Sequence, residues 1–339
     1  MAAGAAKIDI RSLEKEALAT YLVEQLEEPR FRANQIWKWL WQKGATSFSE
    51  MTDLSKTLRQ RLPEFFEIRS LAIDKTQRSQ DGTIKTRFKL HDGHLIESVL
   101  IPVPSDKRYT VCVSSQVGCS LSCKFCATGQ MKRERNLDPA EIFDQVFKVN
   151  QQALETFDHP LTNIVYMGMG EPLLAYQSVL KSIERITSPD GLNMSPRRIT
   201  VSTAGIAKMI KRLADDQVKV NLALSLHAAD DLKRNEIMPI NEQNNLSILQ
   251  DALRYFYEKT QNKITLEYIA FQDFNDQAID AQNLARFCSP FPVVVNIIEY
   301  NPISGFDMIK TSADRLSVFA HSLARLGVQV TVRRSRGKD

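Results

Sequence analysis

The stretch GCSLSCKFCATGQ, residues 118–130, carries Cys119, Cys123 and Cys126 in the spacing C-x3-C-x2-C. Structural zinc needs four tetrahedral ligands, usually supplied by two pairs, and no second pair of Cys or His stands near this stretch. Three small buried hydrophobic side chains are an alternative, but the cysteines are too densely spaced to favour it. Three thiolates on one loop fit an iron–sulfur cluster whose fourth iron takes its ligand from elsewhere.

The cysteine stretch directly follows a predicted strand and opens a repeating β/α pattern. Apolar runs predict strands at 109–114, 163–168, 198–203, 220–227, 264–271 and 293–300, with a closing strand at 328–334. Helical stretches, such as 138–155, 246–260 and 313–327, lie between them. Because the runs are continuous rather than alternating, both faces of the sheet are expected to be covered. We predict an α/β fold with a partial (β/α)6 barrel, and an open doubly wound sheet is the alternative.

Polar and glycine-rich residues follow the predicted strands where each strand ends. GMGEP (168–172) follows the second strand, Ser202 closes the third, Ser225–His227 the fourth, and EYNP (299–302) the last. In β/α barrels the carboxyl ends of the strands meet at one rim, and active sites lie there. The sequence therefore predicts a site at this rim, beside the cysteines.

The composition excludes several classes of protein. The 339 residues are 43% hydrophobic and 25% charged with a net charge of +4, which is ordinary for a globular protein and permits a nucleic-acid partner. Five cysteines, three of them clustered, make a poor disulfide framework. The start of the chain lacks the apolar run of a signal peptide, and no run of about 18 apolar residues predicts a membrane span. We expect a cytoplasmic protein that does not bind a membrane.

Near residue 105 the sequence pattern changes from short helical segments and a hairpin to a repeating β/α pattern, which predicts two domains. Residues 1–104 are expected to form a mainly helical accessory domain with a hairpin that turns at 91–93, and residues 105–339 the barrel. The segment 28–44 holds three tryptophans among Arg30, Arg32, Lys38 and Lys43. Its apolar stripe fits either a core-facing helix or stacking on bases, and its basic side chains could contact phosphates.

Several motifs, taken together and in order, carry a resemblance to a known family. They are C-x3-C-x2-C after the first barrel strand, CVSSQVGCSLSCKFCATGQ, GMGEPLL, TVSTAGI, LALSLHAA, IEYNP and VTVRRSRGKD. The first is the signature of radical S-adenosylmethionine (SAM) enzymes. The whole set resembles the RlmN/Cfr family of RNA methyltransferases, from about residue 20 to the end of the chain.

The resemblance implies the cofactors and their ligands. Cys119, Cys123 and Cys126 would hold a 4Fe-4S cluster, and S-adenosyl-L-methionine would bind its fourth iron. Reductive cleavage of SAM would then give a 5′-deoxyadenosyl radical. Further SAM contacts implied by the matching motifs are Gly170, Glu171, Ser202, Ser225, Leu226, His227 and Asn301.

The resemblance also implies two catalytic residues. Glu97 matches the family's proton-abstracting glutamate, and burial within its apolar run would raise its pKa and make it a usable base. Without the family, an edge-strand glutamate that faces water is the simpler interpretation. Cys112 matches the cysteine that resolves a covalent adduct between RNA and enzyme, although a cysteine in mid-strand is otherwise a core residue.

The expected reaction is methylation of adenine C2 in large-subunit rRNA and in tRNA, with C8 as the alternative position. A flavodoxin or ferredoxin would supply electrons, and the protein would be a monomer. The chain departs from the family pattern after RRSRGKD, where a methyl-carrying cysteine is expected, because the sequence ends at Asp339 and Cys288 does not match. An alternative is therefore SAM cleavage without methyl transfer. A non-catalytic RNA-binding protein with a structural cluster is disfavoured by the intact GMGEP and SLHA motifs.

Overall fold

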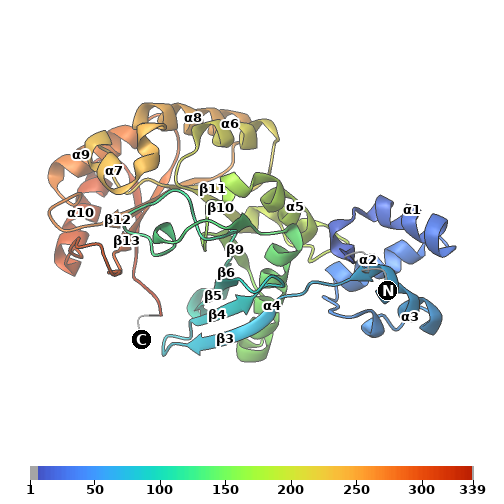
Figure 1. Ribbon diagram of the computed structural model, residues 1–339. Helices are drawn as coiled ribbons and strands as arrows, with labels where there is room; N and C mark the ends of the chain where they lie inside the picture. Colours follow the sequence, from blue (N-terminus) through green and yellow to red (C-terminus); the bar gives the residue numbers. More distant parts are fainter. Residues whose placement is uncertain (1–6, 338–339) are drawn as a thin grey trace.

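The computed structural model describes residues 7–337 and shows a helical unit attached to a larger α/β unit (Figure 1). The helical unit is built around three helices with a pair of short parallel strands. Its elements are β1 (Ile8–Asp9), η1 (Ile10–Ser12), α1 (Lys15–Leu26), α2 (Arg32–Trp41), η2 (Phe48–Glu50), α3 (Lys56–Phe65) and β2 (Phe66–Glu67).

The α/β unit contains one ten-stranded sheet in the order β14-β13-β12-β11-β10-β9-β6-β5-β4-β3. Its strands are β3 (Ala72–Arg78), β4 (Ile84–Lys89), β5 (Leu95–Val103), β6 (Arg108–Cys112), β9 (Asn163–Tyr166), β10 (Ile199–Thr203), β11 (Asn221–Ser225), β12 (Ile264–Ala270), β13 (Val294–Glu299) and β14 (Gln329–Arg333). From β6 to β14 each strand lies parallel to the next along the chain. In a doubly wound sheet the order of the strands reverses at a switch point, whereas here the strands from β6 to β14 follow one another in sequence order across the sheet. The barrel prediction is therefore confirmed, and the doubly wound alternative is wrong.

The predicted domain boundary at 104/105 falls inside this sheet. The hairpin β4–β5 turns at 91–93 as expected, and Gly93 N donates to Leu90 O over 3.0 Å. However, β5 pairs with β6 in antiparallel register from Val99↔Cys112 to Val103↔Arg108. The three antiparallel strands β3–β5 therefore extend the barrel sheet, and the helical unit ends near Glu67.

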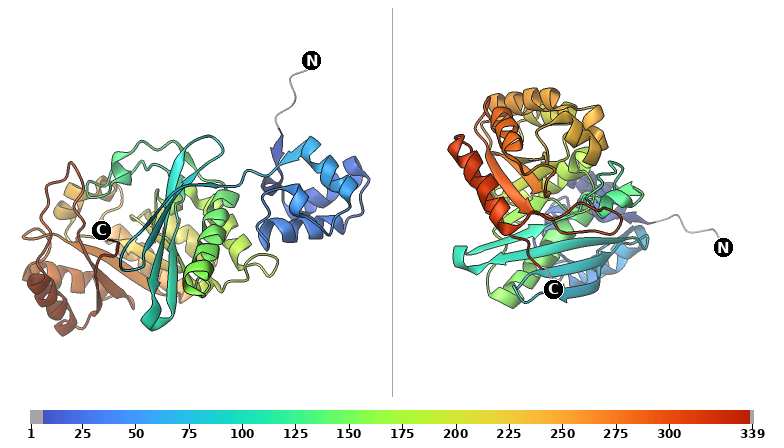
Figure 2. Two further views of the ribbon diagram at one scale, coloured as in Figure 1. Left: turned by 90° about the horizontal axis from the view of Figure 1, so that it is seen from below. Right: turned by 90° about the vertical axis from the view of Figure 1, so that its left-hand side faces the viewer.

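Helices cover the outer, convex side of the curved sheet (Figure 2). They are α4 (Pro139–Phe157), α5 (Tyr176–Thr187), α6 (Ala207–Asp215), α7 (Asp231–Ile237), α8 (Leu246–Thr260), α9 (Ala278–Cys288) and α10 (Ala313–Arg325). Short elements fill the connections: η3 (Pro104–Asp106), β7 (Gln116–Val117), η4 (Thr128–Gln130), β8 (Arg135–Asn136), η5 (Pro172–Ala175), η6 (Pro196–Arg198) and η7 (Pro239–Glu242). Within the described residues, no helix is long and apolar enough to cross a membrane.

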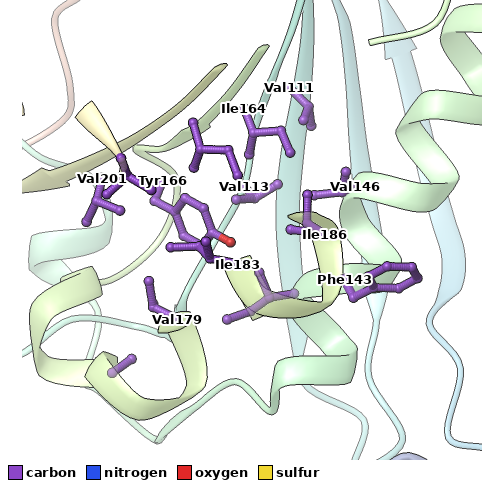
Figure 3. Packing of buried hydrophobic residues seen from close by; sticks show 14 of the residues in the cluster. Val111, Val113, Phe143, Val146, Ile164, Tyr166, Val179, Ile183, Ile186 and Val201 are labelled. Carbon is purple, nitrogen blue, oxygen red and sulfur yellow. The ribbon is translucent and has the colours of Figure 1, made fainter. Parts of the chain in front are cut away.

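The core between sheet and helices explains why the strand sequences are apolar runs. Val111, Ile164 and Val201, on three neighbouring strands, point toward the helices and are fully buried (Figure 3). Tyr166, also labelled in Figure 3, has a buried hydroxyl oxygen that lies 2.8 Å from Ser182 Oγ on α5, within hydrogen-bond distance. Burial of this kind stabilises by about 25 cal/mol per Å² of apolar surface, and it fixes which strand face points inward to the barrel.

The helical unit docks on α4 through buried aromatic and charged contacts. Trp41 meets Phe143 edge-on with ring centroids 5.0 Å apart, and Trp37 and Trp41 are both almost fully buried. Arg11 donates to Asp144 Oδ1 over 2.7 Å, and both side chains are buried. The apolar stripe of α2 therefore packs in the core, and stacking of these two tryptophans on bases is excluded.

The end of the described chain bridges the two edges of the sheet. After β14, Ser335 N donates to Glu299 Oε2 over 3.2 Å, and Gly337 N donates to Asp81 Oδ2 over 3.0 Å. Asp81 lies in the turn between β3 and β4, and Figure 1 shows the last part of the described chain, after β14, near this hairpin. The open side of the partial barrel is thus spanned by residues 334–337.

Candidate active site

The three clustered cysteines line one cavity of about 270 Å³ at the carboxyl ends of the barrel strands. Their loop is held at both sides of the cavity: Lys124 N donates to Ile237 O over 3.0 Å, and Gln130 Nε2 donates to Ser304 O over 3.0 Å. Within the loop, Cys126 N donates to Cys123 O over 3.2 Å. The backbone therefore fixes the loop so that the thiols face a shared space.

Two glycines let the loop fold this tightly. Gly118 has φ +73°, and a Cβ there would lie 2.0 Å from Lys132 O. A Cβ on Gly129 would lie 2.6 Å from Cys123 O. Any side chain at either position would push the cysteine loop away from its return segment.

The three cysteines are not close enough together in this structure to bind one shared metal ion. Among residues 7–337, no three His, Cys, Asp or Glu side chains are grouped closely enough to hold one metal ion. Burial, together with the neighbouring Cys126 and Cys119, raises the pKa of Cys123 to about 12. Thiols that interact but do not converge suit a polynuclear cluster, in which each thiolate binds a different iron.

Glu171 places a buried carboxylate on the cavity wall. Its Oε1 accepts from Leu173 N over 3.0 Å and its Oε2 from Ala204 N over 2.8 Å. Burial raises the pKa of Glu171 to about 7, although these backbone donors oppose the shift. A bound ammonium group would favour the ionised form, because an opposite charge at close range stabilises the carboxylate.

Gly170 allows the GMGEP turn to pack against β7, the short strand that precedes the cysteine loop. It has φ +95°, and a Cβ would lie 2.4 Å from Gln116 Cβ. Gln116 Oε1 accepts from Glu171 N over 2.8 Å. The glycine therefore allows the close approach that orients Glu171 into the cavity.

The structure brings most of the predicted SAM contacts together. Gly170, Glu171, Ser202, Ser225 and His227 line the same cavity as the cysteines. Leu226 is fully buried between two of them and does not line the cavity, and Asn301 lies exposed in the segment that follows β13. These last two positions remain predictions from the resemblance.

His227 is held in one tautomer against the cysteine loop. Its Nδ1 accepts from Ile269 N over 3.1 Å, so the proton of the neutral ring lies on Nε2. Burial lowers the pKa of His227 to about 3, and the ring is neutral at physiological pH. The ring contacts Phe125 edge-on at 4.6 Å, which supports the loop between Cys123 and Cys126.

Glu97 and Cys112 lie on the inner face of the sheet, on β5 and β6, and neither lines the cavity. The burial of alternate residues along β5 places Ile96, Ser98 and Leu100 against the helices and leaves Glu97 on the opposite face. The expected burial of Glu97 is wrong, because its side chain is 43% exposed and lies 3.7 Å from Lys85 Nζ. The alternative of an edge-strand glutamate that faces water is correct about the exposure of Glu97 and wrong about the edge, because β5 pairs on both sides.

One serine links these strands to the GMGEP turn. Ser114 Oγ donates to Glu97 O over 2.7 Å and accepts from Met169 N over 3.0 Å. Ser114 is fully buried and lies two residues after the end of β6. The backbone of Glu97 is therefore tied to the turn that carries Gly170 and Glu171.

Sequence reasoning missed two residues that line the cavity, Glu267 and Phe125, and one that lies behind its wall, Arg234. Glu267 on β12 lines the cavity and accepts from Asn296 Nδ2 over 2.7 Å. Glu267 could have been predicted as a site residue, because a carboxylate is unusual within the apolar run of a buried strand. Phe125 and Arg234 carried no such signal, because an aromatic residue in a loop and an arginine on a helix are ordinary.

The fold and site define a radical SAM enzyme, and comparison with known proteins agrees. The radical SAM superfamily model matches residues 113–284, and the ribosomal RNA large subunit methyltransferase N-terminal domain matches residues 8–68. A crystal structure of a radical SAM methyltransferase from Sphaerobacter thermophilus is 38% identical with a TM-score of 0.91, covering 97% of this chain and 96% of that one.

Curated relatives identify the family. A probable dual-specificity RNA methyltransferase RlmN from Christiangramia forsetii is 53% identical, covering 98% of this chain and 94% of that protein. The corresponding protein of Cytophaga hutchinsonii is 54% identical, covering 97% and 90%, and the dual-specificity RNA methyltransferase RlmN of Anaeromyxobacter dehalogenans is 42% identical, covering 98% and 89%. The chain belongs to the RlmN family and is a radical SAM RNA methyltransferase.

Proposed function

We propose that this protein methylates C2 of adenine in large-subunit rRNA and in tRNA. The observation that carries the proposal is one continuous sheet that presents the cysteine cavity and, on the same inner face, Glu97 and Cys112. A cofactor site alone would serve any radical SAM reaction. A carboxylate and a thiol on the same face of the sheet would provide the acid–base and nucleophilic groups that substitution at an aromatic carbon requires.

The residues of the cavity fit a 4Fe-4S cluster and SAM. Cys119, Cys123 and Cys126 would hold three irons, and Glu171 would accept from the SAM ammonium group. When bound, these cofactors supply one-electron chemistry that generates a radical. The chain's own contribution is to fix the thiols, hold Glu171 by two backbone donors and enclose the site with Phe125 and His227.

Glu97 and Cys112 would act on the base. Glu97 would take the proton from the adenine carbon, and Lys85 Nζ lies 3.7 Å from its carboxylate. Burial raises the pKa of Cys112 to about 12, so the group present at neutral pH is the thiol. For Cys112 to resolve a covalent adduct between RNA and enzyme, its thiol must therefore first lose this proton.

RNA would bind across the rim of the barrel and the helical unit. Lys132 and Arg133, which follow the cysteine loop, and Lys43 on the helical unit are exposed. Trp39 is the half-buried tryptophan of the segment, and Lys43 Nζ lies 3.6 Å from its ring centroid. A base must leave its stack to enter the cavity mouth, so a loop or a distorted helix is the expected RNA target.

The comparisons do not support the expectation of a chain without a methyl carrier. Relatives that are about half identical over nearly the whole chain are named as methyltransferases. Cys288 ends α9 just before β13 begins, at the end of the barrel opposite the cavity. It is buried there, and we propose that it has a structural role. A flavodoxin-like or ferredoxin-like donor, a monomeric state and a cytoplasmic location also remain proposals.

The test is mass spectrometry of nucleosides from unmodified rRNA and tRNA incubated with anaerobically reconstituted protein, SAM and a reductant. We expect 2-methyladenosine in amounts that exceed the enzyme. Formation of 5′-deoxyadenosine without any methylated nucleoside would support the alternative of uncoupled SAM cleavage. Product methylated at C8 would show that the assignment of the position is wrong.

A further inference from the structure

Arg234 on α7 is a fully buried arginine whose hydrogen bonds all go to neutral acceptors. Its guanidinium donates to Leu226 O over 3.1 Å, Ala204 O over 2.6 Å and Ser225 O over 3.2 Å. The remaining bond runs to Asn241 Oδ1 over 2.7 Å. These acceptors satisfy the donors of the side chain, but they do not neutralise its charge.

The charge of Arg234 lacks a direct counterion. Within residues 7–337, no carboxylate lies within 4.0 Å of its nitrogens, whereas the adjacent Lys233 pairs with Asp280 over 2.5 Å. Asp231 attracts Arg234 only at longer range, and Asp231 Oδ1 already accepts from Asn241 Nδ2 and Leu246 N. Burial lowers the pKa of Arg234 to about 10, so the group is still cationic at neutral pH.

The position of Arg234 shows where its counter-charge belongs. Ala204 and Ser225, which Arg234 contacts through their carbonyls, both line the cysteine cavity. Helix α7 also touches the cysteine loop directly, since Lys124 N donates to Ile237 O over 3.0 Å. The cation therefore lies behind the part of the cavity wall formed by the ends of β10 and β11, on a helix that contacts the cysteine loop.

We propose that Arg234 is a positioning residue that compensates the negative charge of the bound cluster and favours its one-electron reduced form. The proposal rests on the proposed function, because it requires a cluster on the three cysteines. Three thiolates and an oxidised 4Fe-4S core carry net negative charge, and reduction adds to it. A protein donor of the flavodoxin or ferredoxin class loses the electron that the cluster gains, and no bond or proton changes.

A buried cation has a large effect on this equilibrium. In a site of low effective dielectric, charge interactions over several ångströms amount to more than about 1 kcal/mol. The reduction potential of such clusters depends on net charge, hydrogen bonds and solvent exposure. Loss of the Arg234 charge is therefore expected to lower the ratio of reduced to oxidised cluster roughly tenfold at a fixed potential.

A purely structural role is the competing explanation, because the guanidinium also ties together the ends of β10 and β11. Substitution by lysine distinguishes charge compensation from a structural role, since lysine keeps the positive charge but cannot form the planar set of hydrogen bonds that arginine makes. Arg234→Lys and Arg234→Met are therefore compared with the wild type. Arg212→Gln, on the exposed side of α6 and paired with Asp216, controls for net charge.

The experiment is a redox titration of anaerobically reconstituted full-length protein, without RNA or SAM, followed by electron paramagnetic resonance. We expect a more negative midpoint potential for Arg234→Met and potentials near wild type for Arg234→Lys and Arg212→Gln. An unchanged potential in Arg234→Met at equal iron content would overturn the proposal. So would a fall in Arg234→Lys equal to that in Arg234→Met.

If Arg234→Met does not fold, the midpoint potential of Arg234→Lys alone tests the proposal. A wild-type potential supports the proposal when the melting temperature of the lysine variant is lowered, and a more negative potential overturns it. Absence of a cluster in the wild-type protein would instead contradict the proposed function.

Discussion

Glu97 and Cys112 are diagonal neighbours on the inner face of the sheet. Val99 of β5 pairs with Cys112 of β6, and Glu97 lies two residues before Val99 on the same face. Diagonal neighbours in an antiparallel ladder lie about 7–8 Å apart. A purine ring placed between the carboxylate and the thiol could therefore contact both, and this spacing motivates the first prediction.

Glu97→Gln is expected to lower the formation of methylated nucleoside by about 10²- to 10⁴-fold, the usual contribution of a general base. Reductive cleavage of SAM should continue, because Glu97 does not line the cysteine cavity. Liquid chromatography of 5′-deoxyadenosine and mass spectrometry of nucleosides measure the two activities separately. Glu258→Gln on the exposed face of α8 is the matched control. Equal loss of both activities would show that Glu97 acts on the cofactor site instead.

Cys123 and Cys288 give a matched pair for the cluster. Both are buried, and burial raises the pKa of each to about 12, but only Cys123 lines the cavity. Cys123→Ala is expected to abolish both the iron–sulfur absorption and SAM cleavage. Cys288→Ala should retain both, with a loss of stability of about 1–2 kcal/mol from the small void. Stoichiometric zinc without iron–sulfur absorption in the wild type would refute the cluster assignment.

Gly170→Ala is expected to weaken SAM binding more than cluster assembly. The new Cβ would lie 2.4 Å from Gln116 Cβ, in a backbone conformation with φ +95°. Because Gln116 orients the backbone of Glu171, the carboxylate should move from the cavity wall. Calorimetric titration of SAM into reconstituted protein measures the effect. Gly93→Ala, with φ +87° but no atom within 4 Å of the new Cβ, controls for backbone strain alone.

The sequence predicted the barrel well because its signals are local. Continuous apolar runs marked every parallel strand from β6 to β14, and the cysteine spacing and GMGEP marked the rim. It predicted less well where the outcome depends on contacts between distant segments. The placement of β3–β5 in the barrel sheet requires the pairing of β5 with β6, and the burial of Trp41 requires Phe143, about a hundred residues further along the chain. Arg234 could not be found, because its hydrogen-bond partners come from the ends of two strands, β10 and β11, and from a 3-10 helix, η7.

His227 is expected to make the protein less stable in acid. Its folded pKa of about 3 lies below the ordinary value of 6.5, so the unfolded chain binds a proton that the folded protein excludes. Stability is therefore unaffected above about pH 6.5 and falls between pH 6.5 and 3 by up to about 1.4 kcal/mol per pH unit. Urea unfolding of wild type and His227→Gln at several pH values should give a flatter dependence for the variant. His321→Gln, an exposed histidine on α10, should keep the wild-type slope.

Two N-terminal deletions are expected to behave differently because the sheet crosses the predicted domain boundary. Removal of residues 1–68 takes away the helical unit and leaves all ten strands, whereas removal of residues 1–104 also takes β3, β4 and β5, and Glu97 with them. The shorter deletion should retain SAM cleavage and lose RNA affinity, provided that Phe143→Ser replaces the aromatic ring exposed by the loss of Trp41.

The longer deletion exposes an edge of β6 and should aggregate. RNA binding measured over a range of salt concentrations gives the second readout, since each lost phosphate contact lowers the slope of log affinity against log salt by about 0.7–0.9. An unchanged slope and affinity in the shorter deletion would show that the helical unit does not contact RNA and that the barrel rim carries all of the phosphate contacts.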